Sequence, residues 1–142
     1  MTTIVYNFKE KVICCDSRAT KGHLIADDNY KKVVKNSMGL TCVVAGLVAD
    51  VEALVETFPS GYEGMSELEA QAFIIYEGDV YECAITEGKY IATPIDCNAV
   101  LGSGGSFALA AMDFGRSAKE AVKYAMTRDA ATGGKIRTVK VK

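Results

Sequence analysis

Residues 2–16 read TTIVYNFKEKVICCD, and this stretch is the strongest local indication of the fold. Two segments rich in apolar and β-branched residues, 2–8 and 11–16, flank Lys9 and Glu10. Short segments of this kind on either side of a two-residue polar turn are typical of a β-hairpin. We therefore expect a hairpin here, with Thr2 at the start of its first strand and Asp16 at the end of its second.

Beyond the hairpin, strand-like and helix-like segments come in groups. Helical spacing of apolar residues predicts a helix over residues 48–58. Two more helices are expected at residues 106–114 and 117–127, the second with a capping box made by Ser117 and Glu120, and residues 66–69 have room for one helical turn. Further strands are expected at residues 20–25, 32–35, 40–45, 72–76, 80–85, 90–94, 99–101 and 136–141. This grouping favours an α+β fold with largely antiparallel sheets, and 142 residues fit one domain.

The charge and the apolar residues of the chain exclude several classes of protein. The net charge is −2, from 16 basic and 18 acidic residues, so there is no electrostatic case for nucleic-acid binding. Although 49% of the residues are hydrophobic, no run approaches the roughly 18 to 20 apolar residues that cross a bilayer. The start of the chain lacks the pattern of a signal peptide, so we expect a cytoplasmic protein with no membrane partner.

The cysteines and the single histidine give no sign of a metal or cofactor site. None of the cysteines forms a C-x-x-C pair, and their odd number argues against a disulfide framework. We expect free thiols at Cys14, Cys15, Cys42, Cys83 and Cys97. A serine–histidine or cysteine–histidine site would have to use His23, and nothing near it resembles a nucleophile elbow.

Thr2 offers a nucleophile that needs no histidine. Removal of Met1 would place a free α-amine on the same residue as the threonine hydroxyl. Such an amine has a pKa near roughly 8, so much of it is available as a base near neutral pH. The pairing of a threonine hydroxyl with its own amine is one established form of nucleophilic catalysis.

Six segments along the chain carry a family resemblance. In order they are residues 2–5 (TTIV), 16–20 (DSRAT), 29–33 (NYKKV), 45–50 (AGLVAD), 101–105 (LGSGG) and 128–134 (RDAATGG). Together they resemble the proteasome β-subunit and HslV family of N-terminal threonine hydrolases. The resemblance implies a single peptidase domain over residues 1–142. Its fold would be the four-layer αββα sandwich of the N-terminal nucleophile hydrolases, with two antiparallel sheets between helices.

The resemblance also implies catalytic roles, residue by residue. Thr2 corresponds to the nucleophile, and its α-amine to the general base. Lys32 corresponds to the buried lysine beside the threonine hydroxyl, and Asp16 to the carboxylate that keeps this lysine charged and oriented. Gly46 corresponds to the residue whose backbone N–H faces the oxyanion. The remaining catalytic matches form the hydroxyl and carboxylate network around the α-amine, and they are Ser103, Asp129 and Thr132.

The matched substrate-binding positions are mostly apolar. They are Ala19, Thr20, Tyr30, Val34, Val44, Val48 and Glu52. An apolar or mixed side chain before the cleaved bond is the expected preference. The alternative is that three of these positions are ordinary core residues with no role in binding: Val34, Val44 and Val48.

The implied function is a threonine-type endopeptidase that acts on polypeptides without a cofactor. The resemblance further implies a homo-oligomer, as a ring or a related assembly, with an ATP-dependent unfoldase as a candidate partner. The chain is short for the family: residues 59–70 leave room only for a remnant of a second long helix, and the end is curtailed after Val141. Two alternatives stay open, a catalytically inactive assembly subunit and an amidohydrolase that acts on small amides.

Overall fold

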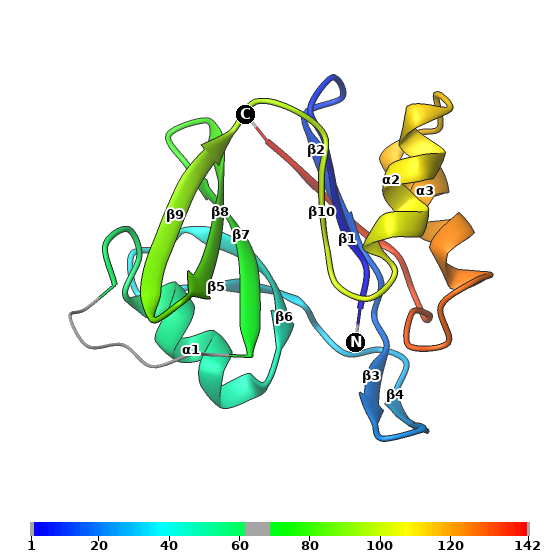
Figure 1. Cartoon of the computed structure of the whole chain (residues 1–142), viewed down its shortest axis with the longest axis horizontal. Helices are drawn as coiled ribbons and strands as arrows, with labels where there is room; N and C mark the ends of the chain where they lie inside the picture. The colour runs from blue at the N-terminus through cyan, green and yellow to red at the C-terminus, as the bar shows by residue number, and fades with distance from the viewer. Residues whose placement is uncertain (1, 62–68, 142) are drawn as a thin grey trace. The chain divides into compact units, whose positions relative to one another are not determined.

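The computed structural model describes residues 2–61 and 69–141. Its internal contacts divide the chain into two compact units (Figure 1). The terminal unit contains the residues up to Lys32 and those from Asp96 onward, and the central unit contains Val33–Ile95. Each unit has its own main sheet and at least one helix packed on it. That the whole chain acts as one peptidase domain stays a prediction.

The terminal unit is built on a four-stranded antiparallel sheet in the order β10-β1-β2-β11. Its strands are β1 (Ile4–Asn7), β2 (Val12–Cys15), β10 (Ala99–Leu101) and β11 (Arg137–Lys140). The predicted hairpin is present, with Ile4 paired to Cys15 and Asn7 to Val12. The Asn7 side chain stabilises the turn by accepting a hydrogen bond from the Glu10 N–H at 3.0 Å.

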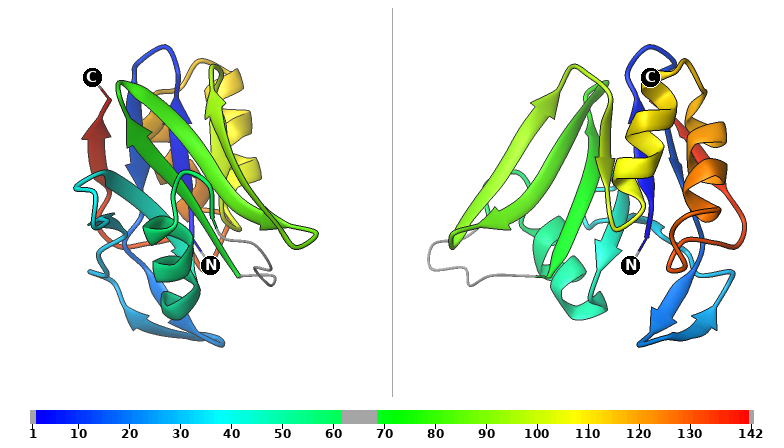
Figure 2. Two further views of the ribbon diagram at one scale, coloured as in Figure 1. Left: turned by 90° about the vertical axis from the view of Figure 1, so that its left-hand side faces the viewer. Right: turned by 45° about the vertical axis from the view of Figure 1, so that its right-hand side comes forward.

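Two helices, α2 (Gly105–Asp113) and α3 (Ala118–Met126), pack on one face of this sheet (Figure 2). Val5 and Cys14 point from the sheet into a core formed with small residues of the helices, such as Ala108 and Ala121. Alanines allow the helices to come close to the sheet. The predicted capping box of α3 is confirmed, since Ser117 and Glu120 exchange both hydrogen bonds.

One strand prediction in this unit is wrong. In place of a single strand over residues 20–25, the chain forms a hairpin of β3 (Ala19–Lys21) and β4 (Leu24–Asp27). The reason is Gly22, whose φ of 63° lies in the left-handed region and turns the chain after Lys21.

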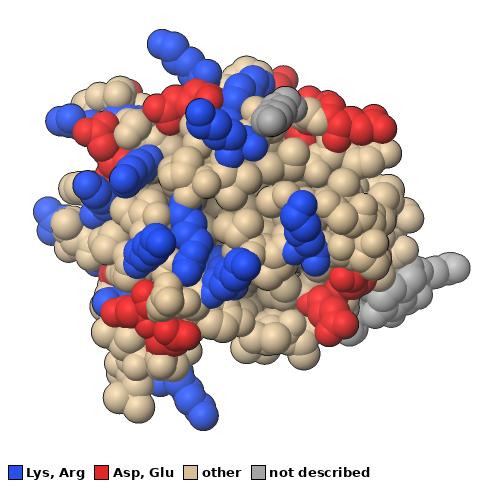
Figure 3. Space-filling view, turned by 180° about the vertical axis from the view of Figure 1, so that it is seen from behind, with Lys and Arg blue, Asp and Glu red and all other residues tan. Residues whose placement is uncertain are grey.

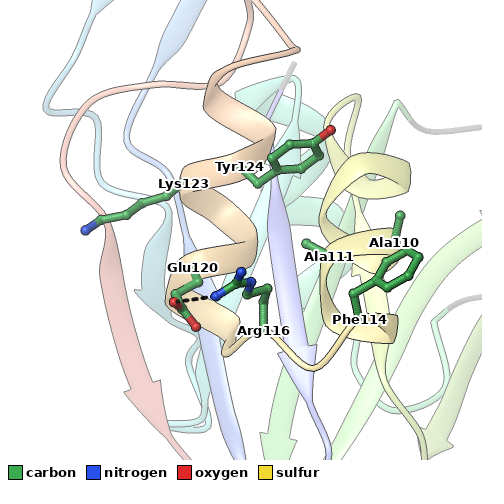
Figure 4. A pocket seen from close by; sticks show the side chains of 7 residues that line it. All are labelled: Ala110, Ala111, Phe114, Arg116, Glu120, Lys123 and Tyr124. Carbon is green, nitrogen blue, oxygen red and sulfur yellow. Dashed lines mark ion pairs between the residues drawn. The ribbon is translucent and has the colours of Figure 1, made fainter.

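A shallow groove lies between α2 and α3, with a volume of about 560 Å³ (Figure 4). Phe114, 90% exposed, and Tyr124 border it. Arg116, in the connection between the two helices, forms an exposed ion pair with Glu120 at 3.7 Å.

The central unit is a five-stranded antiparallel sheet in the order β5-β6-β7-β8-β9, packed against one helix, α1 (Val48–Glu56). The strands are β5 (Val33–Lys35), β6 (Thr41–Gly46), β7 (Ala70–Tyr76), β8 (Asp79–Thr86) and β9 (Lys89–Ile95). Leu54, Val55 and Phe58 pack against Cys42 and Ile74 of the sheet to form the core. The predicted helical turn at residues 66–69 and the remnant of a second long helix lie largely outside the described residues.

The α+β class with antiparallel sheets and associated helices is confirmed. None of the described helices has the length and apolar character that crossing a membrane requires. Lys and Arg side chains are spread over the face shown in Figure 3, and Asp and Glu side chains lie among them at several places. This mixture fits the nearly balanced charge of the sequence.

Candidate active site

Thr2 lies two residues before the start of β1, and its backbone is held by the glycine-rich loop that follows β10. The N–H of Gly104 donates to the Thr2 carbonyl at 3.2 Å. A Cβ at Gly102, where φ is 90°, would lie 2.1 Å from the same carbonyl oxygen. Gly102 and Gly104 are therefore needed because the loop lies against the start of the chain. Thr2 itself is only 2% exposed.

Asp16 follows β2 and is fully buried. The β1–β2 register brings it beside Thr3, whose carbonyl accepts from the Asp16 N–H at 3.2 Å. The carboxylate oxygen Oδ1 accepts from the Thr2 hydroxyl, from the Thr3 N–H at 3.1 Å and from Lys32. The other oxygen, Oδ2, accepts from the backbone N–H groups of Arg18 at 3.3 Å and Gly133 at 3.0 Å. Five donors thus fix the position of this carboxylate.

Lys32 completes the first cluster. Its ammonium donates to Asp16 Oδ1 at 2.8 Å and to the Thr2 hydroxyl oxygen, and the residue is 4% exposed. Its neighbour Lys31 is exposed, as expected if only one of the two lysines points inward. Burial lowers the pKa of Lys32; the charge of Asp16 and its hydrogen bond oppose this, and the net pKa lies below the ordinary lysine value. The cluster therefore joins a hydroxyl, a carboxylate and an ammonium whose proton is held less tightly than usual.

Asp129 is the centre of a second polar cluster. Its Oδ2 accepts from the hydroxyls of Ser103 at 2.7 Å and Thr132 at 2.6 Å. Partial burial acts to raise the pKa of Asp129, but these hydrogen bonds and one from the Ala131 N–H outweigh it and lower the pKa. The carboxylate is therefore ionised at neutral pH and accepts both hydroxyl protons.

The two clusters meet through Thr3, which the sequence did not single out. Its hydroxyl lies 2.7 Å from that of Thr132. Because Thr132 gives its proton to Asp129, the Thr3 hydroxyl is the donor in this contact. Gly133 was also missed as a site residue: its N–H binds Asp16, and a Cβ there would lie 2.4 Å from the Arg18 guanidinium carbon. The sequence signal for Gly133 was the paired glycine at positions 133–134, whereas Thr3 was marked only by its place in the segment 2–5.

Gly46 belongs to the central unit, where it ends β6 before α1. Its φ is 119°, and a Cβ would lie 2.0 Å from the Glu69 carbonyl oxygen. A glycine is thus required at this bend for reasons of backbone geometry alone. Its predicted role at the oxyanion stays a prediction.

The matched substrate-binding positions are divided between the units. Ala19 and Thr20 lie in β3, and Tyr30 is 37% exposed in the terminal unit. The other four lie in the central unit: Val34 and Val44 pack in its core, Val48 is 69% exposed, and Glu52 is exposed on α1. Their role in binding stays a prediction.

Comparison with solved structures shows which known fold the chain shares. The whole chain has the fold of eukaryotic HslV from Trypanosoma brucei, with a TM-score of 0.73 and 22% identity over 98% of this chain and 99% of that one. It is also similar to Thiobacillus denitrificans BPH, whose structure is a complex with epoxomicin, with a TM-score of 0.71 and 14% identity over the full length of both chains. At these identities the likenesses establish the fold.

A family model also matches the first part of the chain. Residues 1–65 match the proteasome family, described as proteasome subunit. No curated protein sequence matches the chain. The resemblance to the proteasome β-subunit and HslV family is thereby confirmed, together with the fold that it implied.

Proposed function

We propose that this protein is a threonine-type endopeptidase, a subunit of a proteasome-like or HslV-like protease whose nucleophile is Thr2 after removal of Met1. The single observation that carries the proposal is the contact of the Lys32 ammonium with both the Thr2 hydroxyl and the buried Asp16 carboxylate. The family match and the HslV-like fold support a proteasome-type protease subunit.

In the proposed reaction, the free α-amine of Thr2 takes the hydroxyl proton as the oxygen attacks the carbonyl carbon of a peptide bond. The Lys32 ammonium, next to that oxygen, favours its negative charge electrostatically. The resulting tetrahedral intermediate collapses when the protonated amine gives its proton to the leaving nitrogen, which leaves an ester on Thr2. Water, deprotonated by the same amine, then hydrolyses the ester and restores the threonine.

The surrounding residues position these groups. Asp16 binds Lys32 and the Thr3 N–H with one oxygen, so the lysine stays beside the nucleophile. We assign the oxyanion contact to the Gly46 N–H, following the resemblance. Asp129, with Ser103 and Thr132, would orient the α-amine through the second cluster, which reaches the N-terminal backbone by way of Thr3.

The proposed assembly is a homo-oligomer, as a ring or a related form, located in the cytoplasm. An ATP-dependent unfoldase is its candidate partner, and polypeptides are its substrates. The apolar matched positions, such as Tyr30, Val44 and Val48, would favour an apolar or mixed side chain before the cleaved bond.

Hydrolysis of small fluorogenic peptides tests the proposal. Thr2→Ala and Lys32→Ala should abolish turnover while the circular dichroism spectrum is kept. Lys31→Ala is the matched control because Lys31 is the adjacent but exposed lysine, and it should leave turnover unchanged. Retained turnover in Thr2→Ala would refute the proposal. A wild-type protein that assembles but neither cleaves peptides nor reacts with an epoxyketone would instead be a non-enzymatic assembly subunit.

A further inference from the structure

Lys32 lies in a segment that no strand supports. β4 ends at Asp27 and β5 begins at Val33, so residues 28–32 have no sheet partner. The long side chain of Lys32 nevertheless has to end at the Thr2 hydroxyl. Besides its direct contact with Asp16, the position of its ammonium therefore depends on the polar contacts that hold this segment.

Arg137 makes three hydrogen bonds through its guanidinium, two of them to this segment and one to Ser17. Nη1 donates to the carbonyl of Tyr30 at 3.1 Å and to the Ser17 hydroxyl, and Nη2 donates to Asn29 Oδ1 at 2.8 Å. The Tyr30 N–H donates to the Ser17 carbonyl at 2.9 Å. Both backbone polar groups of Tyr30, two residues before Lys32, are thus bound to Arg137 or to a residue that Arg137 contacts.

The backbone of Arg137 lies close to Asp16, the residue that forms the buried ion pair with Lys32. It is the first residue of β11, and its register partner on β2 is Cys15, the residue before Asp16. Ser17, directly after Asp16, is fully buried and contacts the guanidinium. One side chain therefore connects the strand that leads to Asp16 with the segment that carries Lys32.

We propose that Arg137 is a positioning residue for Lys32, holding its ammonium beside the Thr2 hydroxyl by clamping the segment before it to Ser17. This inference rests on the proposed peptidase function and deepens it. The clamp requires a guanidinium because two separate nitrogens of one rigid planar group contact three acceptors. A lysine ammonium has the same charge but is a single point that cannot span them.

The test compares Arg137→Gln and Arg137→Lys with Arg116→Gln, a control that makes the same change at an exposed arginine paired only with Glu120 among its described ion pairs. A displacement of about 1 Å at a catalytic group lowers rates about 10²-fold. We expect kcat to fall about 10- to 100-fold in both Arg137 variants on that basis, with a smaller change in KM. An effect through substrate contacts of Tyr30 would instead raise KM and leave kcat unchanged.

A second readout does not need activity. In protein with ¹⁵N-labelled lysine, the titration of the Lys32 ammonium is followed by NMR. Both Arg137 variants should move the Lys32 pKa towards the ordinary lysine value, because a released segment gives the ammonium access to water. Arg116→Gln should leave this titration unchanged.

The outcomes distinguish a failure of the proposed peptidase function from a failure of the proposed role of Arg137. Wild-type protein that is inactive towards peptides and epoxyketones would defeat the proposed function, while the lysine titration would still decide the role of Arg137. Wild-type activity, together with Arg137 variants that match Arg116→Gln in kcat and in the Lys32 titration, would overturn the clamp. If Arg137→Gln does not fold, the milder Arg137→Lys decides alone.

Discussion

Asp16→Asn would replace a carboxylate that five donors share with a neutral amide of nearly the same shape. In its best orientation the amide oxygen still accepts the hydrogen bonds from Thr2, Thr3 and Lys32. The NH₂ group then faces the backbone N–H groups of Arg18 and Gly133. Each of these two donors, of which the Gly133 N–H is buried and the Arg18 N–H partly buried, loses its acceptor, at about 1–3 kcal/mol apiece. Removal of one partner from a buried ion pair costs about 3–5 kcal/mol as a whole. Because the two estimates overlap, we expect the free energy of unfolding at pH 7 to fall by about 3–5 kcal/mol.

Urea unfolding followed by circular dichroism measures this loss. Asp28→Asn is the matched control, since Asp28 also binds an arginine but its side chain is 45% exposed and screened by water. We expect the control to unfold near the wild-type urea concentration and Asp16→Asn to unfold much earlier, with peptide turnover lost. Equal unfolding midpoints for the two variants would refute the view that Asp16 neutralises a buried charge.

The loss of stability in Asp16→Asn should depend on pH, and the direction of that dependence can be tested. The folded pKa of Lys32 lies below its ordinary value of 10.5, so between the two values the unfolded chain binds more protons. Stability therefore rises with pH in this window. Asp16→Asn removes an influence that raises the Lys32 pKa, so the pKa falls further and the window extends to lower pH. The stability deficit of the variant should be largest near neutrality and should shrink as pH rises towards 10. A deficit that does not change with pH would contradict this account.

Three further substitutions test the surroundings of the site and the packing of the terminal unit. Gly104→Ala should lower stability by at least about 1–3 kcal/mol and turnover with it, because a Cβ would lie 1.9 Å from the Thr3 hydroxyl oxygen; an unchanged melting temperature would show that the loop is loose. Thr132→Val should cost about 1–3 kcal/mol in urea unfolding, since the Thr3 hydroxyl loses its acceptor and Asp129 a donor, whereas Thr132→Ser should cost less; equal losses would mean that packing decides. Ser117→Ala removes the capping box of α3 and should cost about 1 kcal/mol in thermal or urea unfolding without changing turnover, so a loss of activity would count against this assignment.

Local patterns in the sequence predicted those parts of the fold whose causes are local. The hairpin of β1 and β2 follows from two β-type segments around a polar turn, and the capping box of α3 is carried by residues 117–120 alone. The β3–β4 hairpin differs from the predicted single strand because Gly22, within that segment, adopts a left-handed backbone conformation and turns the chain.

The site depends on contacts between distant parts of the chain, so local patterns could not predict it. Thr2 contacts Asp16 and Lys32, which are 14 and 30 residues away, and only the family resemblance brought the three together beforehand. Arg137 was not noticed because the segment reads as an ordinary alternating strand, and its contact with Ser17 spans 120 residues. Thr3 was missed for the same reason, since its partner Thr132 is 129 residues further along the chain.

Intact mass spectrometry of the purified protein before and after incubation with epoxomicin tests the central claim most directly. A free α-amine and a nucleophilic hydroxyl on the same threonine are both needed for the expected adduct. The account predicts a chain without Met1 that gains the mass of one inhibitor, with fragmentation placing it on Thr2, and no gain in Lys32→Ala. A chain that keeps Met1, or a chain with a free Thr2 that stays unmodified, would contradict it.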